Sequence, residues 1–110
     1  MNTDKNDLIR HWNDELRRNL TPGGVFMTVG VAALGADLAE RILEAIMTYD
    51  CFCKDSDPYG ERDFGSVKIE GHTIFFKLDY YSLDMKHGSP DPSDPSVTKR
   101  ILTIMLADEY

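Results

Sequence analysis

Hydrophobic positions near the start of the chain recur every three or four residues. Over residues 4–19 they form one stripe, which predicts an amphipathic helix; its members are Leu8, Ile9, Trp12, Leu16 and Leu20. Asp4 and Asp7 lie near its start and Arg17 and Arg18 near its end, an order that the helix dipole favours. The turn-forming stretch "TPGG" at 21–24 predicts that the helix ends before it.

The same spacing returns over residues 38–49 and predicts a second helix. One face of it would carry Leu38, Ile42, Ala45, Ile46 and Tyr49. We expect Asp37 to cap this helix, with Glu40 reaching back to the backbone three residues earlier.

Three further stretches are rich in β-branched and apolar residues and predict strands. Residues 25–32 form one strand, buried on both faces for part of its length. Residues 65–82 form a hairpin, in which a two-residue turn at Glu70 and Gly71 would pair Ile69 with His72. This register also pairs Val67 with Ile74 and places on one face Val67, Ile69, Ile74, Phe76, Leu78 and Tyr80. Residues 97–107 favour a closing strand, with a helix as the alternative.

The predicted order is α-β-α-β-β-β over a single domain, residues 1–110. Consecutive strands usually lie next to each other, and a helix must bury its apolar stripe against another element. The expected fold is therefore α+β, an antiparallel sheet of about four strands with two helices packed on one face.

The net charge of −7 comes from 19 acidic and 12 basic residues, and the excess lies in one segment. Ten of the acidic residues but only five of the basic ones fall within residues 50–94. Such a segment repels nucleic acid and attracts basic partners, although an acidic surface also serves solubility. Binding of nucleic acid needs basic side chains together with exposed aromatic ones. One predicted strand face shows this pattern only weakly, with Phe75, Tyr81, Lys68 and Lys77. No direct contact with nucleic acid is therefore expected.

The two cysteines, Cys51 and Cys53, are separated by one residue, and a disulfide between them would be strained. We expect free thiols in a cytoplasmic protein. The polar start "MNTDKNDLIRHW" is unlike a signal peptide, and no apolar run reaches the roughly 18 residues of a membrane span. No cofactor is expected, and the oligomeric state stays open.

The most unusual stretch is "DPYGERDFG", residues 57–65. With Asp55 it offers hard oxygen ligands at short spacing: Asp55, Asp57, Glu61 and Asp63. The calcium-loop pattern fails, because its fifth position would be Tyr59 and its twelfth Ser66. The prolines and glycines of this stretch are typical of turns, and Arg62 can form an ion pair with a neighbouring carboxylate. The sequence therefore favours a tightly folded loop over a metal site.

General acid–base catalysis offers an alternative. His87 lies in the proline- and aspartate-rich stretch 84–96, while His11 and His72 have no carboxylate cluster beside them. A small hydrolase or metal-dependent enzyme would use His87 with Asp57 and Asp63. Asp91 is a further candidate carboxylate for this role.

Several phrases resemble a known family: "NDELRR", "GVAAL", "DPYGERDFG", "FKLDYYS" and "GSPDPSDPSVTKRILTIMLADEY". The family consists of small uncharacterised proteobacterial proteins, a domain of unknown function found on plasmids, phages and other mobile elements. Its pattern has histidine where this chain has Arg62 and a carboxylate or amide where it has Ser82, which weakens the enzyme hypothesis here. The resemblance implies a mobile-element setting, in which small acidic proteins often block host restriction or CRISPR machinery.

The leading hypothesis is a non-enzymatic, anti-CRISPR-like or anti-restriction-like inhibitor. It would bind a basic, nucleic-acid-binding surface of a host defence complex through the acidic loops at 55–63 and 84–94. The expected contacts are Asp55, Asp57, Tyr59, Glu61, Asp63, Phe64, Tyr81, Asp84, Asp91 and Asp94. A structural or regulatory interaction domain is the other alternative, and it predicts that the "DPYGERDFG" side chains are buried against the sheet.

Overall fold

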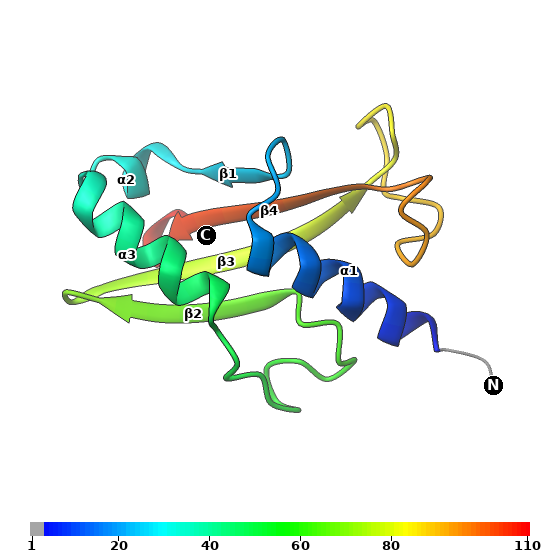
Figure 1. The fold of residues 1–110 in the computed structure, drawn as a ribbon, viewed down its shortest axis with the longest axis horizontal. Coiled ribbons are helices and arrows are strands. Elements are labelled where there is room, and N and C mark those ends of the chain that lie inside the picture. The colour runs from blue at the N-terminus through cyan, green and yellow to red at the C-terminus, as the bar shows by residue number, and fades with distance from the viewer. Residues whose placement is uncertain (1–3) are drawn as a thin grey trace.

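A computed structural model describes residues 4–110, which form three helices, four strands and one 3-10 turn (Figure 1). The helices are α1 (Lys5–Asn19), α2 (Val29–Ala32) and α3 (Ala36–Met47). The strands are β1 (Val25–Met27), β2 (Phe64–Ile69), β3 (His72–Tyr81) and β4 (Lys99–Leu106), followed by η1 (Ala107–Glu109). The sheet order is β1-β4-β3-β2, so the predicted α+β class is confirmed.

The predicted hairpin and its register are confirmed. Strands β2 and β3 are antiparallel, and Ile69 lies opposite His72 and Val67 opposite Ile74. Glu70 and Gly71 have φ of 51° and 81°, the two positive values that a type I′ turn requires.

The prediction of a purely antiparallel sheet is wrong for one pairing. Strand β1 is parallel to β4, with Val25 opposite Leu102, while β4 pairs antiparallel with β3. The amide of Leu102 donates to the carbonyl of Gly24 at 2.7 Å, and that of Thr28 to the carbonyl of Ile104 at 3.0 Å. Because β3 occupies one side of β4, β1 fills the free side, and the chain enters both strands from the same end.

The predicted strand 25–32 is wrong after its third residue. Helix α2 begins at Val29, and Thr28 caps it by accepting the amide of Val31 at 3.4 Å. The same hydroxyl donates to Glu109 Oε1 at 2.7 Å. Val29 is 85% exposed, so the apolar run does not continue as a buried strand. The hydrogen bond to Glu109 and the Thr28 cap together outweigh the β propensity of residues 28–32.

The predictions of a helix over 38–49 and of a strand over 97–107 are confirmed. Helix α3 begins and ends two residues earlier than predicted, and β4 is shorter at both ends. The N-cap of α3 is Gly35, which makes no side-chain cap bond, so the predicted capping role of Asp37 is wrong and Asp37 lies in the first turn. The extended conformation of β4 rules out the helix that was the alternative for 97–107.

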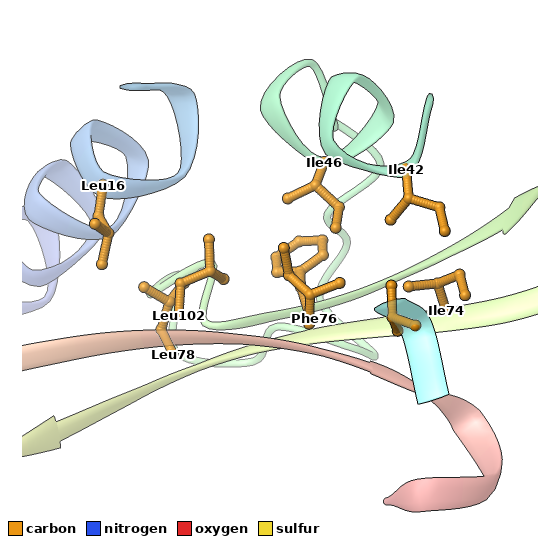
Figure 2. Close-up of a cluster of buried hydrophobic side chains, with 9 residues drawn as sticks. Leu16, Ile42, Ile46, Ile74, Phe76, Leu78 and Leu102 are labelled. Carbon is orange, nitrogen blue, oxygen red and sulfur yellow. The ribbon is translucent and has the colours of Figure 1, made fainter. Parts of the chain in front are cut away.

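The core lies between the helices and β3 and β4 (Figure 2). Figure 2 shows Leu16 of α1 and Ile42 and Ile46 of α3 pointing toward the sheet. The whole cluster is Leu16, Val31, Ile42, Ile46, Ile74, Phe76, Leu78, Leu102 and Ile104. Each such side chain contributes about 1.5–3 kcal/mol when fully buried. This core fixes α1 above β3 and β4.

Candidate functional site

The buried face of α1 includes polar side chains that the apolar stripe did not predict. Asn13 is fully buried, and its Nδ2 donates to Tyr80 Oη at 2.8 Å and to the carbonyl of Glu61 at 3.0 Å. Its Oδ1 accepts from Arg100 Nε at 2.6 Å. One side chain therefore joins α1 to β3, to β4 and to the segment before β2.

Tyr80 and Arg100 extend this network in opposite directions. The hydroxyl of Tyr80 donates to Glu61 Oε1 at 2.8 Å, and burial raises the pKa of that hydroxyl. Arg100 lies 5.0 Å from the centre of the Tyr80 ring and donates to the carbonyl of Pro92. Burial lowers the pKa of Arg100. The network thus connects both loops that the sequence identified.

Asp14 lies among three arginines beside this network. Its carboxylate is 3.0 Å from Arg17, 3.0 Å from Arg62 and 3.8 Å from Arg18. Arg17 also donates to the carbonyls of Ile46 and Tyr49, both at 3.0 Å, at the carboxyl end of α3. A cation is favourable there, because the helix dipole places partial negative charge at the carboxyl end of a helix. Burial lowers the pKa of Arg17.

The carboxylates of the "DPYGERDFG" stretch mostly face inward. Both oxygens of Asp57 accept the amide of Arg62 at 3.1 Å, and they hold that residue at a left-handed φ of 56°. Glu61 accepts from Tyr80, as described above. Asp63 is half-buried, and its burial, followed by the charge of Glu61, raises its pKa. The carboxylates of Asp57 and Glu61 therefore shape the loop through internal hydrogen bonds.

The other predicted contacts from this region lie apart. Asp55 is exposed, and Tyr59 is 71% exposed. Phe64 packs against Phe75 on the sheet face away from the core, with ring centroids 5.1 Å apart. Tyr81 alternates onto that same outer face. The structure therefore divides this set between a loop surface and the outer face of the sheet.

The segment 82–96 holds its three predicted carboxylates in local turns. Asp84 Oδ1 accepts from the Ser82 hydroxyl at 2.5 Å and from the Lys86 amide at 3.0 Å. Asp91 Oδ1 accepts from the hydroxyl of Ser93 at 2.6 Å, and Asp94 Oδ1 from that of Ser96 at 2.7 Å. The serine hydrogen bonds lower the pKa of Asp84 and of Asp91. These carboxylates are fixed in place, and those of Asp84 and Asp91 are ionised well below neutral pH.

The three groups of the enzyme hypothesis are not joined by any side-chain hydrogen bond or ion pair within residues 4–110. His87 is exposed in the segment between β3 and β4, which Figure 1 shows at one end of the sheet. Asp57 and Asp63 lie in the segment between α3 and β2, which Figure 1 shows below β2. Among the described residues, no three His, Cys, Asp or Glu side chains are grouped to hold a metal ion. No helix in this part of the chain is long and apolar enough to cross a membrane.

The sequence interpretation missed the residues at the centre of the network. They are Asn13, Asp14, Arg17, Tyr80 and Arg100. One signal was present: Asn13 and Arg17 are four residues apart and share the helix face of Ile9 and Leu16. Polar residues at helical spacing within an apolar stripe indicate a buried network when partners exist elsewhere in the chain.

Comparisons with known proteins give one match. Neither the curated proteins nor the solved structures provide a significant similarity. A family model described as "Protein of unknown function (DUF3768)" matches residues 27–109. That range contains both loops, β2, β3 and β4, and all partners of the α1 polar residues outside α1 itself. The chain therefore belongs to the DUF3768 family of proteins of unknown function.

Proposed function

We propose that this protein is a non-enzymatic inhibitor from a mobile element that binds a basic, nucleic-acid-binding surface of a host defence complex, in the cytoplasm. The observation that carries the proposal is the set of fixed carboxylates in segment 82–96. Asp84, Asp91 and Asp94 each accept hydrogen bonds through Oδ1 from a serine two residues away. The resemblance to proteins of plasmids and phages supplies the setting.

Fixed carboxylates suit the recognition of a surface that normally binds phosphates. A side chain that is already ordered does not lose further conformational entropy on binding, so more of the charge attraction remains as affinity. The Asp84 and Asp91 side chains meet this condition and, with lowered pKa values, keep their charge. Complementary charge also speeds the encounter with a basic partner.

The structure also supports a difference between the two loops in how much each contributes to the contact with the partner. In segment 55–63, Asp57 accepts the Arg62 amide through both oxygens and Glu61 accepts from Tyr80, whereas Asp55 and Tyr59 are exposed. In segment 82–96 the serine hydrogen bonds use Oδ1 of each aspartate, and Oδ2 of Asp91 lies 3.6 Å from Lys5 Nζ. We therefore assign the main contact to Asp84, Asp91 and Asp94, with Asp55 and Tyr59 at its margin. The network through Asn13 and Arg100 holds the two loops in a fixed relation.

The test removes charge without removing the turns. In the triple variant Asp84→Asn, Asp91→Asn, Asp94→Asn, the amide oxygen can still accept the serine hydrogen bonds. The matched control, Asp37→Asn, Glu40→Gln, Glu44→Gln, removes the same charge from α3. Both would be expressed in a proteobacterial host that carries a CRISPR or restriction system, and phage plating efficiency would be measured.

We expect the wild-type chain and the α3 control to restore phage plating, and the loop variant to lose most of that effect. The purified wild-type chain should also bind the purified defence complex, with an affinity that falls as salt rises. Full inhibition by a folded loop variant would refute the assignment of the contact. Unchanged phage plating with wild-type protein, across hosts with different defence systems, would refute the function itself.

A further inference from the structure

The face of the sheet that turns away from the helices carries an aromatic cluster. Figure 2 shows α1 and α3 on one side of the strands, and the core residues of β3 and β4 point to that side. The residues that alternate with them point to the other side, the outer face. There the ring centroids of Phe64, Phe75 and Tyr110 lie 5.1, 5.8 and 5.9 Å apart. Tyr110 is 76% exposed, so part of this cluster faces solvent.

Apolar residues of β4 and β1 continue the outer face beyond this cluster. Met105 lies opposite Phe75, and Met105 and Ile101 are 4% and 7% exposed. At the edge of the sheet, Phe26 lies opposite Thr103 and is 54% exposed. Among the described residues, all three helices place side chains in the core on the other side of the sheet. Several exposed or half-exposed apolar side chains in one patch indicate an interaction surface.

Two opposite charges lie at the centre of the outer face. Lys77 and Asp79 are two residues apart on β3, and Lys77 Nζ lies 2.8 Å from Asp79 Oδ2. Each side chain is 35% exposed, so each can also reach a partner molecule. Leu78, between them, points into the core. A positive and a negative residue placed in this way are complementary to themselves under a two-fold axis that crosses β3 at Leu78.

Such an axis, lying in the plane of the face, reverses the strand direction in a second copy of the chain. Lys77 of one copy then lies over Asp79 of the other, and Asp79 over Lys77. Phe75 and Tyr81, each three residues from Leu78, also lie over each other, so aromatic rings meet at both ends of the contact. An axis along the strand would instead place Lys77 over Lys77, which like charges disfavour. The favoured arrangement is face-to-face packing of two sheets, as in β-sandwiches.

We propose that this protein forms a two-fold symmetric dimer through the outer face of its sheet, with Lys77 and Asp79 paired reciprocally between the two copies. A partner surface of a single charge sign would repel one of these two central residues, whereas a second copy pairs both. The aromatic side chains around them supply the apolar contact area. The inference stands independently of the proposed inhibition, because it uses the sheet and not the carboxylates of segment 82–96.

The test uses two charge-reversal variants that repel themselves but attract each other. In a dimer of Lys77→Glu both facing pairs are acidic, and in a dimer of Asp79→Lys both are basic. When the two variants are mixed in equal amounts, both facing pairs of the mixed dimer again join opposite charges. Sedimentation velocity would measure the mass over a dilution series up to about 1 mM, where even a weak dimer is populated. Circular dichroism would confirm that each variant folds.

We expect the wild-type chain to approach twice the mass of one chain as its concentration rises, and each variant alone to have a dissociation constant at least about tenfold higher. The equimolar mixture should recover the dimer. This recovery cannot come from a role of the ion pair within one chain, because that pair stays broken in both variants.

The matched control carries Lys54→Glu and Asp55→Lys, which reverse two exposed neighbouring charges outside the sheet, and it should dimerise like wild type. A wild-type chain that stays monomeric up to about 1 mM would overturn the proposal. So would single variants that dimerise like the control, or a mixture that dimerises no better than either variant alone.

Discussion

Replacing Tyr80 by phenylalanine removes one oxygen atom and two hydrogen bonds. The hydroxyl donates to Glu61 Oε1 and accepts from Asn13 Nδ2, both at 2.8 Å. A hydrogen bond to a charged group contributes about 1.5–3 kcal/mol and a neutral one about 1 kcal/mol. The amide of Asn13 keeps its second bond, to the Glu61 carbonyl at 3.0 Å, which limits the loss. We expect Tyr80→Phe to reduce the free energy of unfolding by about 2–3 kcal/mol.

Urea denaturation followed by circular dichroism would measure this difference. With a urea dependence of about 1–3 kcal/mol/M, the midpoint should fall by about 1–2 M. The melting temperature should fall by about 10 °C, since each kcal/mol corresponds to about 4–8 °C in a domain near this size. The matched control is Tyr81→Phe, in the next residue, whose side chain lies on the outer face of the sheet.

Tyr81→Phe should change stability by less than about 0.5 kcal/mol. A loss for Tyr80→Phe no larger than that of the control would refute the energetic role of the network. A second check uses Glu61→Gln, which keeps an acceptor and removes the charge. In that background Tyr80→Phe should cost about 1 kcal/mol less, because the charge-assisted part of the hydrogen bond is already lost.

Three further predictions follow from single contacts. Gly65→Ala should destabilise the fold by about 1–3 kcal/mol, because the new methyl group would overlap the Phe76 ring. Thermal melts would measure the loss, with Gly88→Ala as the control, since its Cβ would lie 3.9 Å from the Tyr80 carbonyl oxygen. Glu70→Asn should stabilise the hairpin by about 0.5 kcal/mol, because asparagine adopts the positive φ of this position more readily than glutamate does. The same substitution removes the ion pair between Glu70 and Arg41, and Arg41→Ala measures that loss separately. The raised pKa of Asp63 means that the folded state holds this proton more tightly, so its contribution to stability is lost as pH rises through the folded pKa. Asp63→Asn should therefore gain stability relative to wild type as pH rises from 3 to 7 in a denaturation series, and a constant difference across that series would contradict the assigned environment.

Short-range features of the sequence predicted much of the fold. The hairpin register followed from alternation around Glu70 and Gly71, whose backbone adopts the turn that such a pair favours. Helices α1 and α3 followed from apolar spacing over four turns and three turns of chain. These signals are local, because each depends on residues within a few positions of one another.

The polar face of α1 depended on partners far along the chain. Asn13 bonds to groups 48, 67 and 87 residues away, at Glu61, Tyr80 and Arg100. Burying an amide is favourable only where such partners satisfy it, so the helix pattern alone indicated Trp12 and missed Asn13. The same holds for the site: the sequence located the acidic loops, but only the folded structure turned Asp57 toward the Arg62 amide and Glu61 toward the Tyr80 hydroxyl.

The sequence by itself determined the α+β class, two of the helices, the hairpin and the position of the two acidic loops. Tertiary structure decided that β1 runs parallel to β4, that the chain after Met27 turns into a helix, and that Asp57 and Glu61 face inward. The physical reason is the same in each case. Pairing at a sheet edge and hydrogen bonding of buried polar groups both need a partner that folding brings from a distant part of the chain, and no local pattern specifies that partner.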